Sequence, residues 1–574
     1  MKCIWRNVWF FGVVLALACG IVSAQNLNTP IPLAKGQLIA FLGDSITQQN
    51  LYSRYVELML NEQFPDLDLH FVNVGWSGRH SAHLMDDAVL ERDLVRLKPD
   101  MVLILFGMND GWYRNPPVLQ AVAAYHDNMD NLVSKIMRAL PNTRIVLLTP
   151  TICDPSISNY LKGYNGTLGD MAQYVSDLAA RRNLPLIDLH KPMLRVDAAA
   201  KAADQSFTMI PDGVHPNPSG HWLLATLIDG AFYQGAPLRA RVEIDAQTGT
   251  VVSETQAVVS DFHTQKGAYT FTQTLPRALI VPPIEARAAV NFAPVQAARD
   301  QATLIVDNLR PDTTYGVYIN NHLFGRFTAA ELTAGIDWTL PKQDDPLTER
   351  VLGLAMTKFQ YRWAAWRNPG TGLAEISPDV ANSDEWKAFD TALNGLVRQA
   401  DTEEHRLIAD AKEYTWSIVP ETAIDLPKWE VTGPFNYQSF NVSYPPEIGT
   451  ADLDWTTMGA VNGFLDFSPA FGQFRNSLVC ARVRLYVPHE TRLALSAGSD
   501  ASIKIWVNGT LCIARDTFRT AQPGQDSGVA TLEPGWNTIL ARENRGNYGW
   551  GLYIQAYLSD LTPDEMKLVR TNPM

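Results

Sequence analysis

The sequence predicts a multidomain protein in which an α/β domain comes first and mostly β structure follows. Short apolar runs alternate with helical periodicity between residues 37 and 235, a pattern typical of βαβ units with helices on both faces of a parallel sheet. From about residue 241 the pattern changes to short alternating runs, which indicate a second, β-rich part. The 574 residues suffice for three or four domains of roughly 150 residues each.

The first domain is expected to span residues 25–240. Its strand candidates are short apolar runs at residues 38–42, 69–74, 101–106, 144–148 and 186–189. Its helical candidates lie at residues 51–64, 84–97, 118–140, 168–182 and 218–232. Because open α/β sheets bind ligands at the carboxyl ends of their strands, the residues that follow each strand are the ones to search for chemistry.

Three further segments complete the expected organisation. Residues 241–340 predict a small β module. Residues 341–415 predict a helical segment, in which aromatic residues such as Phe359 and Trp363 recur at helical spacing and are expected to be core. Residues 420–574 predict a β-sandwich.

The N-terminus has the features of a secretory signal peptide over its first 24 residues. Lys2 and Arg6 precede an apolar run at residues 8–18, and small residues lead to a cleavage site near Ala24. The apolar run is shorter than the ~20 residues that span a bilayer. The mature protein is therefore expected to be secreted or periplasmic, with a lipid anchor at Cys19 as the less favoured alternative.

The composition of the chain argues against some classes of binding partner. The net charge of −13 argues against nucleic acid and against an anionic membrane surface, and no stable membrane insertion is expected. Cleavage would leave Cys153, Cys480 and Cys512, too few for a disulfide framework, although the last two could pair. No Cys/His cluster has the spacing of a metal site, so neither a metal nor a cofactor is expected.

Four short blocks follow the predicted strands. The first strand runs into Gly-Asp-Ser with Ser45, the second ends at Gly75, and the third is followed by Asn109. The fourth block is Asp-Gly-Val-His, from Asp212 to His215, just before the last helix. A serine with a histidine and a carboxylate behind it is the arrangement that makes a hydroxyl nucleophilic at neutral pH.

These blocks, in this order and strand context, resemble the SGNH (GDSL) hydrolase superfamily of esterases and lipases over residues 36–235. The resemblance implies a flavodoxin-like three-layer sandwich with a five-stranded parallel sheet. It also implies that Ser45 is the nucleophile, His215 the general base and Asp212 its acidic partner. The Ser45 N–H, the Gly75 N–H and the Asn109 side chain correspond to the oxyanion hole. Ile46 departs from the leucine of the family's name, a change that affects packing more than chemistry.

Four residues that directly follow the blocks are candidates for the substrate pocket, and plain loop packing is an equal alternative. They are Trp76, Arg79, Trp112 and Tyr113.

The C-terminal segment is similar in texture to the jelly-roll modules attached to secreted polysaccharide-active enzymes. Ile503, Ile505 and Val507 alternate before an Asn-Gly hairpin turn, and residues 532–537 and 547–553 are rich in Trp, Tyr and Gly. Both a sugar-binding face and a packed core or spacer remain open.

Three functions follow. The leading hypothesis is a secreted serine ester hydrolase that removes acetyl or other short acyl groups from carbohydrate through an acyl-enzyme. The second is a lipid or lysophospholipid esterase with the same triad, although no interfacial helix is evident. The third is a carbohydrate-binding protein with an inactive hydrolase domain, which the complete Ser-His-Asp set disfavours.

Overall fold

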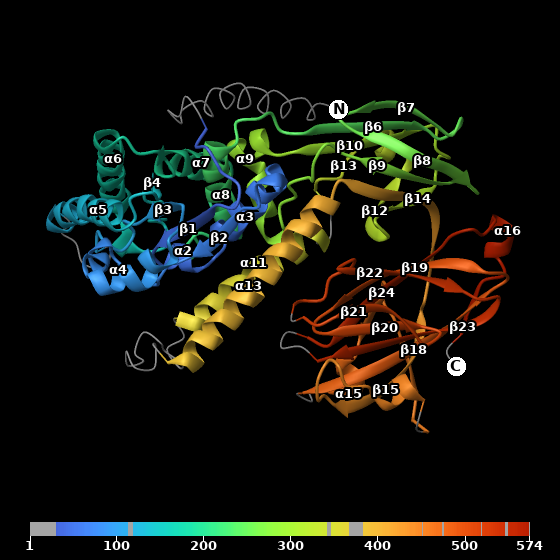
Figure 1. Cartoon of the computed structure of the whole chain (residues 1–574). Coiled ribbons are helices and arrows are strands. Elements are labelled where there is room, and N and C mark those ends of the chain that lie inside the picture. Colours follow the sequence, from blue (N-terminus) through green and yellow to red (C-terminus); the bar gives the residue numbers. More distant parts are fainter. Residues whose placement is uncertain are drawn as a thin grey trace. The chain divides into compact units, whose positions relative to one another are not determined.

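The computed structural model describes residues 30–112, 119–340, 346–366, 383–449, 452–472, 476–517, 519–545 and 549–572. These residues form two compact units, shown in Figure 1. The first contains the described residues up to Arg239, residues 275–302 and the described part of 344–412. The second contains residues 240–274, the described part of 303–343 and the described residues from Glu413 onward.

The first unit is built on a five-stranded, all-parallel sheet with the order β2-β1-β3-β4-β5. Its strands are β1 (Leu38–Gly43), β2 (His70–Asn73), β3 (Met101–Leu105), β4 (Arg144–Leu148) and β5 (Leu186–Ile187). This order is that of the flavodoxin-like sheets, so the predicted fold class is confirmed.

Helices cover both faces because alternate strand residues point to opposite sides. One core combines Ile39 and Phe41 of β1 with side chains of α3 (Tyr52–Gln63) and α8 (Pro218–Phe232). The other combines Ala40 and Leu42 with side chains of α5 (Leu119–Ala139) and α6 (Tyr164–Arg182). The helices of this region are α2 (Ser45–Gln48), α3 (Tyr52–Gln63), α4 (Asp87–Asp93), α5 (Leu119–Ala139), α6 (Tyr164–Arg182), α7 (His190–Ala203) and α8 (Pro218–Phe232).

Two helical predictions differ from the structure. The helix expected at residues 84–97 is three short pieces, namely η2 (Ser81–Met85), α4 and η3 (Val95–Leu97). The break before α4 occurs at Asp86, whose side chain accepts the Ala88 N–H and so starts a new helix. Helix α7 was not predicted. It has a proline in its first turn and a run of alanines, so its apolar periodicity is weak.

Two long helices belong to this same unit. Helices α11 (Pro346–Trp366) and α13 (Asp384–Asp410) lie side by side and pack against α3 (Figure 1). Val351 and Leu352 of α11 and Ile408 of α13 are part of the core that α3 and α8 share with the sheet. The short helices η5 (Ile284–Asn291) and α9 (Ala293–Ala298) pack against α8.

The second unit is mostly antiparallel β structure. A four-stranded sheet has the order β13-β10-β6-β7, from β6 (Arg239–Asp245), β7 (Thr250–Thr255), β10 (Gln301–Asp307) and β13 (Ile336–Asp337). A nine-stranded sheet contains β8 (Val258–Gln265), β9 (Ala268–Thr274), β11 (Thr314–Ile319), β12 (His322–Thr328), β14 (Glu413–Ile424), β17 (Phe464–Asp466), β19 (Thr491–Ser499), β22 (Asp526–Leu532) and β24 (Gly551–Leu558). Strand β14 pairs with β9 and β11 and also with β24, and so joins the β module to the C-terminal strands.

A seven-stranded sheet completes this unit. Its strands are β15 (Lys428–Asn436), β16 (Thr456–Gly459), β18 (Ser477–Val487), β20 (Ile503–Val507), β21 (Thr510–Arg515), β23 (Gly535–Asn544) and β25 (Arg570–Asn572). One apolar core contains side chains of both large sheets, as in a sandwich. The hairpin between β20 and β21 has positive φ at Asn508 and Gly509, as the Asn-Gly pair predicts.

Among the described residues, no helix has the length and apolar character needed to cross a membrane. Cys153, Cys480 and Cys512 are all free thiols.

Candidate active site

Ser45 lies where β1 ends and α2 begins. The side chain of Asp44 accepts the Ile46 N–H at 2.9 Å and caps this short helix, which leaves Ser45 as its first residue. Gly43 is required here, because a Cβ would lie 2.2 Å from Thr47 Oγ1 and 2.6 Å from the Leu105 carbonyl. Ile46 is buried in the core, where an apolar side chain is all that is needed.

His215 and Asp212 lie in one turn before α8. Asp212 Oδ1 accepts the backbone N–H groups of Val214 and His215, and Asp212 Oδ2 lies 2.6 Å from His215 Nδ1. Asn217 caps α8 through the Gly220 N–H, and Pro218 is its first residue. These local hydrogen bonds hold the imidazole at the start of the helix, as the sequence predicts.

The turn that carries His215 and Asp212 lies next to Ser45, although 170 residues separate Ser45 from His215. His215 Nε2 lies 2.8 Å from Ser45 Oγ, so a continuous row of hydrogen bonds runs from Ser45 through His215 to Asp212. The His215 side chain is 29% exposed and that of Asp212 is 55% exposed, so the row is open to solvent and substrate. Partial burial raises the pKa of Asp212, but its hydrogen bonds with His215 and Val214 outweigh that effect and lower it. Asp212 is therefore a carboxylate at neutral pH, suited to orient the imidazole and stabilise its charged form.

Two of the three residues expected to form the oxyanion hole, Gly75 and Asn109, already donate to partners within the protein. The Gly75 N–H donates to Asn73 Oδ1 at 2.9 Å, and Asn109 Nδ2 donates to the Arg79 carbonyl at 3.0 Å. The Asn109 amide has a second N–H to offer, whereas the Gly75 amide has one hydrogen and would have to share it or turn from Asn73.

Asn73 is a functional candidate that sequence reasoning missed. Its Nδ2 donates to the Thr47 carbonyl at 2.6 Å and to Ser53 Oγ at 2.8 Å, while its Oδ1 accepts the Gly75 N–H. Gly75 itself lies close to the α2 backbone, since a Cβ there would be 2.4 Å from the Gln48 nitrogen. Asn73 thus links the serine segment to the glycine segment. Asn73 stands two residues before Gly75 in the sequence, but nothing in the sequence indicates its partners.

The four pocket candidates have different surroundings. Trp112 is 58% exposed, has a φ of 55° and lies against the His80 ring, with 5.4 Å between centroids. Trp76 is half-buried, with the guanidinium of Arg79 5.2 Å from its ring centroid. The Arg79 side chain is buried and pairs with Asp93 at 2.7 Å. Tyr113 lies outside the described residues.

Two buried carboxyl groups flank the site. Burial raises the pKa of Asp44 to about 7, and the hydrogen bond from Ile46 only partly offsets this. Burial also raises the pKa of Asp110, which accepts both the backbone N–H and the hydroxyl of Ser81. Asp110 therefore braces its loop.

Among the described residues, one group of carboxylates has the spacing of a metal site: Glu57, Asp401 and Glu404. All three contact the ammonium group of Lys358, which already supplies a cation at their centre.

Comparisons with known proteins find relatives of the first unit. Residues 41–223 match the GDSL-like lipase/acylhydrolase family. An acetylxylan esterase of Geobacillus stearothermophilus is 26% identical over 211 residues, which cover 34% of this chain and 92% of that protein.

Two solved structures also match. A gut microbial diltiazem-metabolizing enzyme has a TM-score of 0.54 and 19% identity, over 67% of this chain and 98% of its own. An acetylxylan esterase structure from Geobacillus stearothermophilus has a TM-score of 0.30 and 24% identity, over 36% of this chain and 98% of its own. The first of these shows a shared fold that extends well beyond the region matched by the family.

The match to GDSL-like acylhydrolases and the similarity to an acetylxylan esterase define an enzyme that hydrolyses ester bonds. The first unit contains a domain that matches the GDSL-like lipase/acylhydrolase family over residues 41–223, and the protein is a carboxylic ester hydrolase.

Proposed function

We propose that the protein is a serine esterase in which Ser45, His215 and Asp212 form the catalytic triad. The observation that carries this proposal is the row of hydrogen bonds of 2.8 Å and 2.6 Å that joins the three side chains. His215 takes the proton of Ser45 as the hydroxyl attacks the ester carbonyl, and then gives it to the departing alcohol. Water, activated by the same imidazole, hydrolyses the acyl-Ser45 intermediate and restores the enzyme.

The negative charge on the substrate oxygen is stabilised by N–H donors at the strand ends. We assign this role to the Ser45 and Gly75 N–H groups and to the free N–H of the Asn109 side chain. Because such donors act on charge that develops in the transition state, they affect kcat more than substrate binding.

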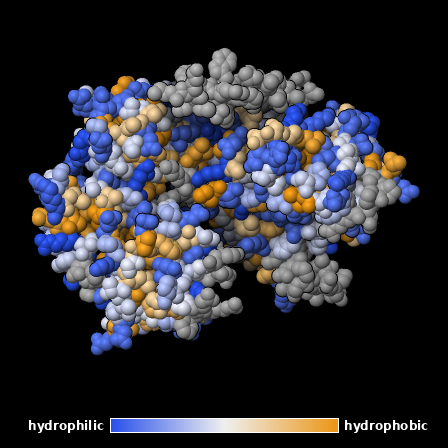
Figure 2. Space-filling view, turned by 180° about the vertical axis from the view of Figure 1, so that it is seen from behind, coloured by the Kyte–Doolittle hydropathy of each residue, from blue (hydrophilic) through white to orange (hydrophobic). Residues whose placement is uncertain are grey.

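The proposed substrate is carbohydrate that carries acetyl or other short acyl groups. The acetylxylan esterase relative supports this choice, as do the expected export of the chain and its β-rich C-terminal part. On the face drawn in Figure 2, apolar residues occur in small groups separated by hydrophilic ones, which suits a polar substrate better than a lipid surface.

The decisive experiment replaces the nucleophile. Ser45→Ala should lower kcat on p-nitrophenyl acetate by at least about 10⁴-fold with an unchanged circular dichroism spectrum. A sulfonyl fluoride probe should label Ser45 in the wild type, and Ser134→Ala on α5 should match the wild type in both assays. Full activity of Ser45→Ala, or labelling of another serine, would refute the triad.

A substrate panel then tests the acyl and alcohol groups. Acetylated xylo-oligosaccharides and p-nitrophenyl esters of increasing chain length are compared by kcat/KM. Acetyl esters should be the best substrates. A preference for chains of about eight carbons would favour a lipid esterase, because each buried CH₂ adds about 0.8 kcal/mol only where an apolar channel exists.

A further inference from the structure

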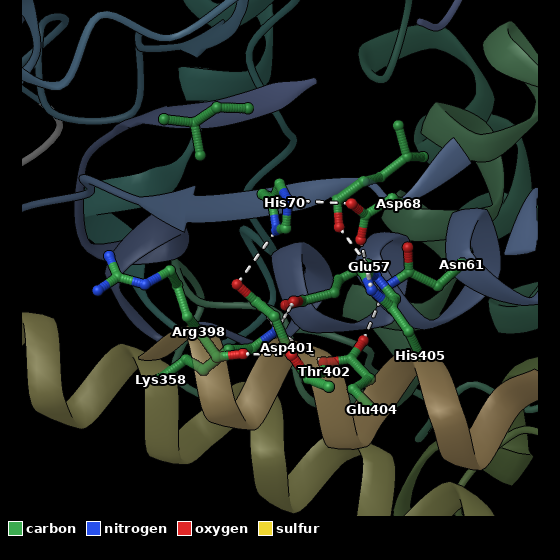
Figure 3. A network of polar contacts seen from close by, with 12 residues as sticks. Glu57, Asn61, Asp68, His70, Lys358, Arg398, Asp401, Thr402, Glu404 and His405 are labelled. Atoms are coloured by element: carbon green, nitrogen blue, oxygen red, sulfur yellow. Dashed lines mark hydrogen bonds and ion pairs between the residues drawn. The ribbon is translucent and has the colours of Figure 1, made fainter. Parts of the chain in front are cut away.

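A buried network of charges joins the helices α11 and α13 to the hydrolase sheet (Figure 3). Its centre is Lys358 of α11, 3% exposed, whose Nζ contacts Glu57 of α3 and lies 2.7 Å from Asp401 and 2.6 Å from Glu404 of α13. Glu57 and Asp401 are each 6% exposed and Glu404 is fully buried. Such groups are stable only with their partners in place, so the network ties α3, α11 and α13 together.

The same network reaches the sheet. Asp401 Oδ2 lies 3.2 Å from His70 Nδ1, at the start of the edge strand β2. Asn61 of α3 donates to Glu404 at 2.8 Å, and His405 lies 3.0 Å from Asp68. The helix pair α11 and α13 therefore contacts both α3 and the start of β2. Asn73 is the last residue of β2, and Gly75 follows two residues later.

Helix α11 continues along this strand toward the active site. Ala355, Lys358, Phe359 and Arg362 share one face of α11, at the spacing of successive turns. They line a cavity of about 10 Å³ together with Asn50, Ser53 and Asn73. A cavity of this volume is too small for a substrate. It places this face of α11 beside Asn73, whose Oδ1 accepts the Gly75 N–H.

The contact closest to the active site is aromatic. Trp363, one turn beyond Phe359, lies against Trp76, with 6.1 Å between ring centroids and 37° between planes. Trp76 directly follows Gly75, and its own N–H donates to the carbonyl of Gly43 at 3.0 Å. The guanidinium groups of Arg79 and Arg92 lie 5.2 Å and 5.4 Å from the Trp76 centroid.

We propose that α11 is a positioning element of the esterase site, and that Trp363 is the positioning residue that fixes the Gly75–Trp76 segment through its contact with Trp76. The proposal rests on the function proposed above, in which the Gly75 N–H stabilises the oxyanion. The Lys358 network anchors α11 to α3 and β2, and Trp363 transmits that anchoring to the peptide that carries the donor. Movement of this peptide by about 1 Å would weaken the hydrogen bond to the oxyanion, because that bond depends steeply on geometry.

The test begins with Trp363→Leu in the full-length chain. We expect kcat on p-nitrophenyl acetate to fall about tenfold while KM stays within about twofold, since the donor acts on the transition state. Trp363→Phe should recover most of the loss because it retains an aromatic ring. Phe389→Leu is the matched control, an exposed aromatic residue of α13 that contacts Trp386, and it should behave as the wild type.

A double-mutant cycle separates positioning from general destabilisation. If Trp363 acts through Trp76, then Trp363→Leu should cause no further loss of kcat in a Trp76→Leu background. Independent, multiplicative losses would overturn the proposal, as would an increase of KM at unchanged kcat, which would make Trp363 a substrate-binding residue. If Trp363→Leu does not fold, the same cycle with Trp363→Met, which also removes the aromatic ring, decides by the same criterion.

Ser45→Ala, assayed in parallel, keeps the two proposals apart. Full activity in Ser45→Ala refutes the catalytic triad. An inactive Ser45→Ala together with wild-type kcat in Trp363→Leu overturns only the positioning role.

Discussion

Two histidine–carboxylate pairs of the first unit contain the same chemical groups in opposite settings. His215 and Asp212 are three residues apart, lie within hydrogen-bond distance at 2.6 Å and are open to solvent. His70 and Asp401 are 331 residues apart, lie 3.2 Å from each other and join a strand to a distant helix. The third partner also differs, because Ser45 lies next to the first pair and the ammonium of Lys358 next to the second.

The difference shows that the surroundings of a histidine–carboxylate pair decide whether it can take part in catalysis. A solvent-accessible imidazole whose far nitrogen contacts a hydroxyl can take a proton from it and pass it on. A pair whose carboxylate is buried against a lysine has no reactive group to serve, and its charges hold elements together. Each proposed role can be tested by removing one partner.

The largest expected effect comes from this comparison itself. Asp212→Asn should lower kcat by about 10³–10⁴-fold with little change in stability, because the amide cannot stabilise the charged imidazole. Lys358→Met should instead lower the free energy of unfolding by about 3–5 kcal/mol, because it leaves three buried carboxyl groups without their cation. Urea unfolding and steady-state kinetics on both variants check this. A stable Lys358→Met protein, or an unfolded Asp212→Asn protein, would reverse the assignment.

The fold and the first pair could be predicted from sequence because both depend on short-range patterns. Five apolar runs predicted the five strands, and Asp212 and His215 lie in one turn before a helix that Asn217 and Pro218 begin. Because the carboxyl ends of parallel strands lie at one edge of the sheet, Ser45 was then expected to lie near Asp212 and His215.

The second pair could not be predicted, because no local pattern relates residue 70 to residue 401. Helical spacing did predict Phe359 and Trp363 as packed residues, and both have aromatic neighbours. It gave no indication that Lys358 and Arg362 share that face, since a charged residue on a helix is ordinarily solvated. Which domain this face packs against depends on tertiary contacts alone.

The next effect concerns the donors at the strand ends. Asn109→Ala should lower kcat by about 10²–10³-fold and leave KM nearly unchanged, as loss of one oxyanion donor does. Asn394→Ala on α13 removes a side-chain amide that donates to Asp390, and it is the matched control. An effect confined to KM would mean that Asn109 binds the substrate in its ground state.

The smallest effect is the part of the pH dependence of stability that the buried network contributes, beside that of buried carboxyl groups elsewhere such as Asp44. Burial raises the pKa of Glu57 to about 8, although the ammonium of Lys358 opposes this, and the hydrogen bond with Asp401 raises the pKa of His70. Both groups hold their protons more tightly when folded than when unfolded. The folded protein therefore binds more protons than the unfolded chain between the two pKa values of each group, and stability falls as pH rises through that window.

The measurement is the urea midpoint at pH 6.5 and at pH 8.5. Histidines whose pKa is lowered by burial, such as His190 and His221, are partly protonated in the unfolded chain at pH 6.5, so they oppose the fall, and they do so equally in the wild type and in Glu57→Gln. The midpoint of the wild type should fall across the window, and Glu57→Gln should fall less because its amide does not titrate. Glu91→Gln, an exposed change on α4, should follow the wild type. Equal slopes for Glu57→Gln and the wild type would mean that Glu57 is ionised throughout, and that the three carboxylates around Lys358 carry their full charge.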